Sequence, residues 1–162
     1  KQEANKTYYS ILKMLSKIKQ RNLYLSKTPH IIINGAIETK EYDYLYEQWN
    51  RPTHERWKKF TQEHNIQITF NDELKPIQNI KDKEYIGYWF FRQRSDRRSI
   101  MVDIKDTRVE YKSNTLLIMK NTHKFKVINN SSRLPYMLNI TIKFDKKQQE
   151  KLIELLDHGA KI

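Results

Sequence analysis

The chain has 162 residues, of which 31 are lysine or arginine, 19 are acidic and none is cysteine. This length is enough for one domain that buries its own core, and the lack of cysteine excludes disulfides, thiolate metal sites and cysteine nucleophiles. The net charge of +12 favours a polyanionic partner, either nucleic acid or an anionic membrane. Charge spread diffusely over a domain also serves solubility alone.

Two absences bear on where the protein works. The sequence contains neither an apolar run of about 18 residues nor a secretory signal peptide. We therefore expect an intracellular protein, cytoplasmic or nuclear, that is not secreted and has no transmembrane segment. Because the chain begins at Lys1 and not at methionine, we interpret it as one compact unit excised from a longer protein.

The first part of the chain, residues 1–65, predicts a helical region that contains a short hairpin. Apolar residues recur at helical spacing over residues 5–20, and they predict a lysine-rich amphipathic helix. Such a helix either docks on its own domain or binds a membrane surface or a partner. Residues 29–39 predict a hairpin, because Asn34-Gly35 is the preferred pair for a two-residue type I′ turn.

Two further helices follow, and then the pattern changes to strands. Apolar stripes predict helices over residues 42–49 and 57–64, with a bend at Pro52, which cannot donate a hydrogen bond inside a helix. From residue 66 onward, runs of strand-forming residues are separated by turn residues. The predicted strands span residues 66–70, 83–94, 99–105, 108–112, 115–120, 124–128 and 136–144.

Residues 146–157 predict a closing amphipathic helix. Asp145 caps its start, Gln148 completes a capping box three residues later, and Gly159 suits the position just past its end. Residues 66–162 are therefore expected to form an antiparallel β-sheet with a C-terminal helix.

The fold class that we expect is α+β. It consists of N-terminal helices, a bent antiparallel β-meander of about five to seven strands, and the closing C-terminal helix. This layout resembles that of pleckstrin-homology domains in shape alone, because the sequence contains no motif that indicates membership.

The most informative stretch for function is residues 85–112. It begins with an aromatic cluster, and an arginine-rich turn follows directly. Rings that stack on bases, beside guanidinium groups that hold phosphates, are the combination with which proteins grip single-stranded nucleic acid. The candidate binding residues are Tyr88, Trp89, Phe90, Arg92, Arg94, Arg97, Arg98, Lys105, Arg108 and Lys112.

Strand geometry divides this aromatic cluster between two faces. Trp89 alternates with Tyr88 and Phe90, so both faces are apolar and one of them should cover the core. The other face either stays open, so that Tyr88 and Phe90 form a stacking platform, or is covered by the N-terminal helices. Gly87, which has no side chain, predicts that another element approaches this strand closely.

No catalytic signature stands out. Acid-x-Lys pairs, which metal-dependent nucleases use to hold divalent cations, occur at residues 38–40, 103–105 and 110–112. Three unrelated matches show how common the pattern is in a charged protein. The histidines lack the spacing of a zinc site, and neither a nucleophile elbow nor a phosphate-binding glycine loop is present. We expect no metal and no cofactor.

The sequence therefore predicts a non-catalytic domain that binds nucleic acid, DNA or RNA, through the aromatic and arginine-rich hairpin and a basic surface. The main alternative is a protein-interaction or assembly module of a larger complex. A metal-dependent nuclease and a domain that binds anionic lipid are further alternatives.

Overall fold

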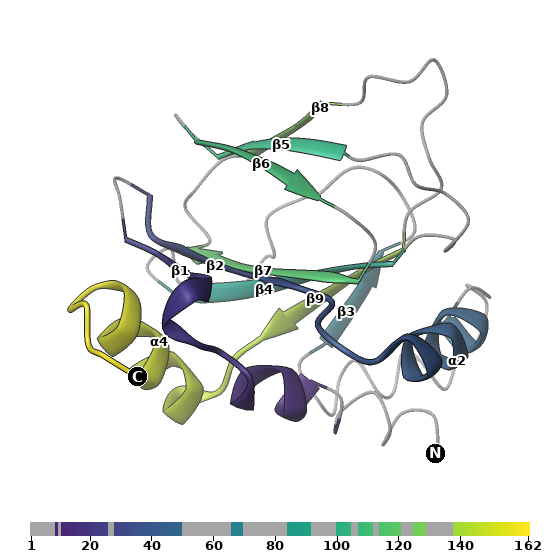
Figure 1. Cartoon of the computed structure of the whole chain (residues 1–162), viewed down its shortest axis with the longest axis horizontal. Helices are drawn as coiled ribbons and strands as arrows, with labels where there is room; N and C mark the ends of the chain where they lie inside the picture. The colour runs from purple at the N-terminus through teal and green to yellow at the C-terminus, as the bar shows by residue number, and fades with distance from the viewer. Residues whose placement is uncertain are drawn as a thin grey trace.

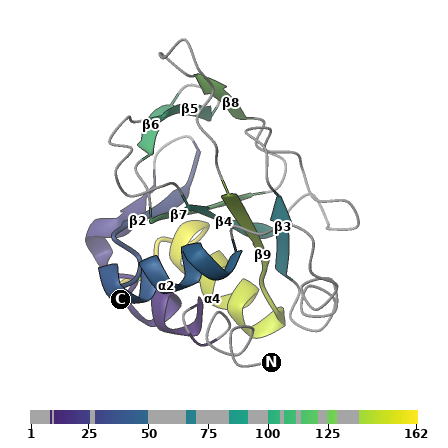
Figure 2. The ribbon, with the colours of Figure 1, turned by 90° about the vertical axis from the view of Figure 1, so that its right-hand side faces the viewer.

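A computed structural model describes the chain in separate stretches. The described residues are 9, 11–25, 28–49, 66–69, 84–91, 100–104, 107–111, 114–120, 125–128 and 138–162. They form an α+β fold in layers (Figures 1 and 2). A six-stranded sheet lies in the middle, helices cover one of its faces, and a three-stranded sheet lies on its other side.

Both sheets are antiparallel throughout the described strands. The six-stranded sheet has the order β1-β2-β7-β4-β9-β3, and the three-stranded sheet has the order β6-β5-β8. The strands are β1 (Leu23–Tyr24), β2 (His30–Asn34), β3 (Ile66–Thr69), β4 (Tyr85–Phe91), β5 (Ile100–Ile104), β6 (Thr107–Tyr111), β7 (Thr115–Lys120), β8 (Phe125–Ile128) and β9 (Leu138–Lys143). The predicted α+β class, with an antiparallel sheet and a C-terminal helix, is confirmed.

The predicted meander is wrong, although each predicted strand segment contains a strand. In the six-stranded sheet β7 lies between β2 and β4, and β9 lies between β4 and β3. The chain leaves this sheet after β4, forms β5 and β6 in the other sheet, and returns as β7. The physical reason is burial, because every residue from Leu116 to Met119 is buried and such a strand belongs at the centre of a sheet.

The predicted hairpin over residues 29–39 is also wrong. Its first half exists as β2, and Gly35 adopts the positive φ expected of a turn residue, +61°. No return strand follows, because both edges of β2 are already paired, with β1 and β7. Asn114 holds the chain there: its carbonyl accepts from the Ala36 N–H at 3.0 Å, and its side-chain Nδ2 donates to the Ile37 carbonyl at 2.7 Å.

The N-terminal helix docks on the domain. Residues 11–16 are helical, and Ile11, Met14 and Ile18 are buried. The helix is shorter than predicted: the Lys17 N–H closes a tight turn onto the Met14 carbonyl at 3.1 Å, and a separate 3₁₀ helix, η1 (Gln20–Asn22), follows. The apolar stripe of this helix is therefore used in the core.

Two further predicted helices appear as α2 (Thr39–Trp49) and α4 (Lys146–Leu156). The Asp145 side chain accepts from the Gln148 N–H at 2.8 Å, and the Asp145 N–H donates to Gln148 Oε1 at 2.9 Å, so the predicted capping box of α4 is confirmed. Gly159 follows the helix with a φ of +64°. The helix predicted over residues 57–64 and the bend at Pro52 lie outside the described residues.

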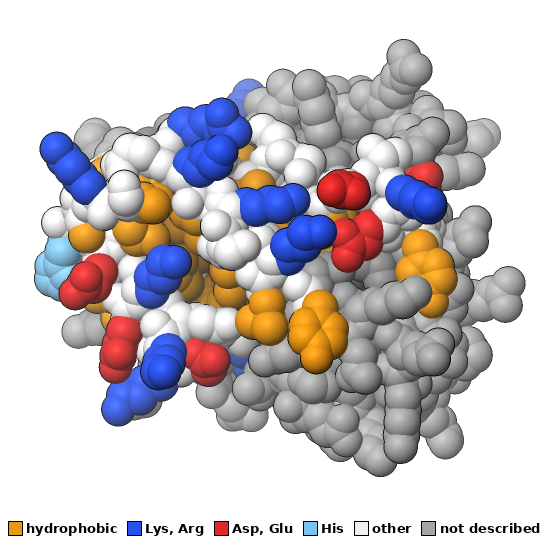
Figure 3. Space-filling model, turned by 60° about the horizontal axis from the view of Figure 1, so that its bottom comes forward, with side chains coloured by type: hydrophobic (Ala, Val, Ile, Leu, Met, Phe, Trp, Pro, Cys, Tyr) orange, Lys and Arg blue, Asp and Glu red, His pale blue; other side chains and the backbone are white. Residues whose placement is uncertain are grey.

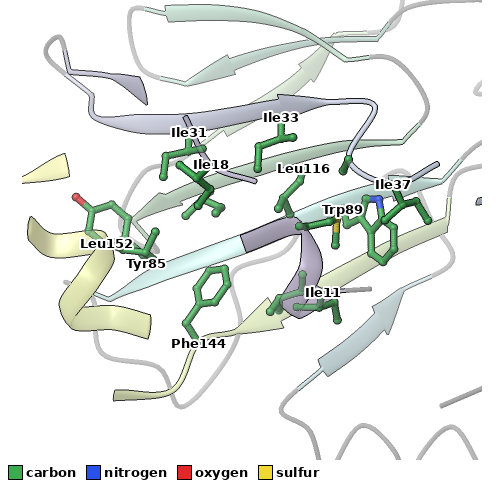
Figure 4. Close-up of a cluster of buried hydrophobic side chains, with 14 of the residues drawn as sticks. Ile11, Ile18, Ile31, Ile33, Ile37, Tyr85, Trp89, Leu116, Phe144 and Leu152 are labelled. Atoms are coloured by element: carbon green, nitrogen blue, oxygen red, sulfur yellow. The ribbon is translucent and has the colours of Figure 1, made fainter. Parts of the chain in front are cut away.

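The main core lies between the helices and the six-stranded sheet (Figure 4). Side chains of the N-terminal helix and α4 meet Trp89 of β4, Leu116 of β7 and Ile31 of β2 there. A Cβ on Gly87 would lie 3.0 Å from Cζ of Phe144, which is tighter than nine in ten real Cβ contacts, so the close approach predicted at this glycine is confirmed. No helix in the described part of the chain is long and apolar enough to cross a membrane.

Candidate nucleic-acid interface

Two of the three aromatic candidates for base stacking are inside the protein. Tyr88 is 1% exposed and Trp89 is fully buried. Trp89 Nε1 donates to Asn114 Oδ1 at 3.2 Å, and burial raises the pKa of the Tyr88 hydroxyl to about 12. Tyr88, expected to form a stacking platform with Phe90, is therefore not open to a base, and neither is Trp89. Phe90 belongs to β4, and its side chain lies outside the described part.

β4 is paired along both edges, by β7 and β9, and both of its faces are covered by other layers of the fold. In the register, Tyr88 is opposite Leu117 of β7 and Thr141 of β9. The helices cover the face that holds Trp89 (Figures 1 and 4). On the opposite face, where the three-stranded sheet lies, Ile86, Tyr88, Leu117 and Met119 are all buried. The N-terminal helices thus cover the Trp89 face and not the Tyr88 face.

Arg108 is the one predicted phosphate-binding residue whose side chain falls in the described part of the chain. It is exposed on β6, and its register position is opposite Asp103 of β5, which is itself opposite Lys126 of β8. An acidic residue therefore stands beside Arg108 in the sheet. The other predicted cations lie outside the described residues: Arg92, Arg94, Arg97, Arg98, Lys105 and Lys112.

The acid-x-Lys pairs do not assemble into a described metal site. Residues 38–40 stand at the start of α2, far along the chain from β5 and β6, which contain Asp103 and Glu110. Among the described residues, no group of three or more histidine and acidic side chains is placed to hold a metal ion.

The charge of the chain is more concentrated than its composition indicates. Residues 4–37 contain six basic residues and no acidic residue, and residues 111–144 again contain six and none. The rest of the chain holds the remaining 19 basic residues against all 19 acidic ones. These two acid-free runs therefore carry the whole net charge of +12. The positions of the acidic residues in the sequence already mark these runs.

The fold joins the two acid-free runs. β2 belongs to the first run and β7 to the second, and they pair from His30 opposite Met119 to Asn34 opposite Thr115. β1 extends the first run to the edge of the same sheet. Segments about 80 residues apart in the sequence thus lie side by side, although the paired strands themselves hold only one cation, Lys120 of β7.

The first acid-free run presents four cations to solvent, which we call the N-terminal basic surface. It consists of Lys13, Lys17, Lys19 and Arg21, all exposed. None of the four forms an ion pair within the described part of the structure. Figure 3 shows the helical side of the molecule, where Lys and Arg side chains spread across the surface with hydrophobic side chains exposed between them.

The cations of α4 are arranged differently. Lys147 and Lys151 share a shallow surface hollow with Glu150 and Glu154. Lysine and glutamate three or four residues apart on a helix are neighbours and partly neutralise each other. This mixed surface is less suited to phosphate than the N-terminal basic surface.

A second charged group joins α4 to the sheet. The Tyr85 hydroxyl donates to Asp157 Oδ1, and Lys120 Nζ lies 3.1 Å from the same oxygen. Burial, together with the hydrogen bond and the charge of Asp157, raises the pKa of Tyr85 well above its usual range. Burial acts to raise the pKa of Asp157, but the bonds from Tyr85 and Lys120 and the Lys120 charge outweigh it and lower that pKa. The group is a structural connection.

His30 is likewise part of the framework. It is buried, its Nδ1 lies 2.7 Å from the Thr28 carbonyl oxygen, and its ring stacks on Tyr24 with centroids 4.9 Å apart. Because a carbonyl only accepts, Nδ1 carries the hydrogen. Burial lowers the pKa of His30, which keeps the imidazole neutral and makes it no part of the basic surface.

Comparison with known proteins adds no family. No protein-family model matches the chain, and no curated protein matches it.

Proposed function

We propose that the protein is a non-catalytic domain that binds nucleic acid through phosphate contacts, with the N-terminal basic surface as its principal contact. The observation that carries the proposal is that this surface lies in an acid-free run of 34 residues and presents four exposed cations without an acidic partner in the described structure. Lysine and arginine that neutralise phosphates release counterions, and this release drives sequence-independent binding.

The arginine-rich turn keeps its place in the proposal as a second contact. Four arginines follow β4 directly in the sequence, namely Arg92, Arg94, Arg97 and Arg98. One guanidinium group can donate two parallel hydrogen bonds to the oxygens of a phosphate. Tyr88 and Trp89 have no part in the proposed contact, because both are buried.

The experiment compares two variants that lose the same charge from different surfaces. The first replaces Lys13, Lys17, Lys19 and Arg21 with glutamine. The second replaces the four exposed lysines of the C-terminal region with glutamine, namely Lys146, Lys147, Lys151 and Lys161. Fluorescence anisotropy measures binding of each variant to labelled single-stranded DNA, single-stranded RNA and duplex DNA over a series of salt concentrations.

We expect the first variant to lose most of its affinity and the second to lose little. Each phosphate contact contributes about 0.9 to the slope of log K against log salt for duplex DNA and about 0.7 for a single strand. The first variant should therefore lower the slope by about 3, whereas the second should lower it by less than 1. Equal losses in both variants would show that net charge alone acts, and the proposed site would be rejected.

A protein-interaction module is the second candidate, and the edge of the six-stranded sheet favours it. Tyr24 and Leu25 are large apolar residues that are about half exposed at β1. The Ile162 N–H donates to Gln20 Oε1 at 3.3 Å, so another exposed apolar residue lies at the same edge. If the wild-type chain binds none of the three nucleic acids at physiological salt, this edge becomes the leading candidate surface.

A further inference from the structure

The N-terminal helix exposes an aromatic ring beside its lysines. Tyr9 is 67% exposed, the highest exposure among the large hydrophobic side chains described. Lys13 and Lys17 follow it at intervals of four residues, and both are exposed. Residues four apart on a helix have their Cβ atoms about 5–6 Å apart on one face. Tyr9 and Lys13 therefore lie on the outer side of the helix, and Lys17 follows in the turn that ends it; we call these three residues the row.

The opposite side of this helix fixes the row in place. Ile11, Met14 and Ile18 are buried in the core, and Figure 4 shows Ile11 and Ile18 directed toward the sheet. The backbone that carries the row is therefore docked on the core and does not have to fold upon binding. A preformed surface loses less conformational entropy when a ligand binds.

We infer that this row binds single-stranded nucleic acid, with one base stacked on the Tyr9 ring and successive phosphates on Lys13 and Lys17. The inference rests on the proposed function and names its substrate class. A stacking ring needs a base that is free of its duplex neighbours, whereas phosphate contacts alone do not distinguish one strand from two. A row that combines a ring with cations therefore selects the single strand.

A membrane surface suits this helix less well. Helices that lie in the membrane interface bury a wide apolar face in it. Here Ile11, Met14 and Ile18 are packed in the core, and among the described residues of the exposed side the large apolar ones are Tyr9 and the 36% exposed Leu12. In this described part, the row offers cations to phosphates but no wide apolar face for insertion.

The experiment uses the full chain and three variants of it, two at Tyr9 and one at the neighbouring Leu12. Tyr9→Ala removes the ring, Tyr9→Phe keeps it, and Leu12→Ala removes a neighbouring apolar side chain that has no aromatic face. Anisotropy is measured with a labelled oligo-dT and with a duplex of mixed sequence and equal length, and thermal unfolding confirms that each variant is folded. Wild type is also tested for sedimentation with phosphatidylserine vesicles.

We expect Tyr9→Ala to weaken oligo-dT binding about tenfold and to leave duplex binding within about twofold of wild type, because stacking on one base is lost. Tyr9→Phe and Leu12→Ala should bind oligo-dT as wild type does. Equal affinity of wild type and Tyr9→Ala for oligo-dT would overturn the stacking role while leaving the phosphate contacts of the proposed function intact. Wild type that sediments with vesicles and binds neither nucleic acid would overturn both.

Discussion

The N-terminal helix and α4 lie on the same side of the six-stranded sheet, but they use their polar residues differently. Both bury apolar side chains in one core, with Met14 from the first and Leu152 from the second. α4 also makes polar bonds to the sheet, because Gln149 Oε1 accepts from the Tyr85 N–H at 2.9 Å and Gln149 Nε2 donates to the Tyr85 carbonyl at 2.7 Å. The N-terminal helix and the residues that follow it, up to Arg21, keep their four cations exposed.

This difference separates residues that maintain the fold from residues that are free for a partner. The charged group of Asp157 and Lys120 near the end of α4 is committed to the framework, whereas the N-terminal basic surface can lose its charge without breaking any described ion pair. Like charges close together on a surface repel and gain nothing for the fold.

The largest expected loss of stability comes from a substitution on the apolar side of the N-terminal helix. Met14→Ala should lower the free energy of unfolding by about 3 kcal/mol, because Met14 is fully buried and its removal leaves a cavity. The control is Leu12→Ala on the outer side of the same helix, with an expected loss below about 1 kcal/mol. Urea unfolding followed by circular dichroism measures both. Similar losses would show that the helix is not docked as described.

A smaller effect is expected from the polar attachment of α4. Gln149→Ala should cost about 2 kcal/mol, since it leaves the buried N–H and carbonyl of Tyr85 without their side-chain partner. Glu150→Ala, one position further along the helix and exposed, is the control and should cost less than about 0.5 kcal/mol. Should both substitutions prove equally mild, α4 would be held by its apolar residues alone, and the contrast with the N-terminal helix would disappear.

Local signals in the sequence predicted local structure well. The capping box of Asp145 and Gln148 depends on residues three apart, and the positive φ of Gly35 depends on the turn itself, so both could be predicted. The choice of strand partners could not be predicted, because β2 pairs with β7 across about 80 residues. The residue pattern of either strand does not identify the other as its partner. The hairpin and meander predictions failed for that reason.

The candidate site was predicted less well than the fold. Alternation showed that both faces of β4 are apolar, but it does not show what covers each face, and the burial of Tyr88 and Trp89 depends on elements distant in the sequence. The acid-free runs are visible in the sequence alone. Their meeting at the β2 and β7 pair, and the exposure of Tyr9 beside Lys13, required the structure.

The smallest effect concerns the charged bridge between Asp157, at the end of α4, and Lys120 of the sheet. Asp157→Asn should cost about 1 kcal/mol or less at pH 7, because both partners of this ion pair are partly exposed and the asparagine oxygen still accepts from Tyr85. The pKa of Asp157 is lowered in the folded protein, so its stabilising charge is present above its ordinary pKa of 3.8 and is lost as the pH falls through the folded value. The difference in the free energy of unfolding between Asp157→Asn and wild type should therefore shrink toward zero in acid.

Urea unfolding of wild type and Asp157→Asn at pH 7 and pH 3 measures this dependence. Glu154→Gln is the matched control, because it removes the same charge from an exposed position of the same helix. If Glu154→Gln reproduced the cost of Asp157→Asn at pH 7, the effect would come from the overall charge of α4 and not from the bridge. The ion pair of Asp157 and Lys120 would then no longer serve as the example of charges that stabilise the fold, in contrast to the exposed charges of the N-terminal basic surface.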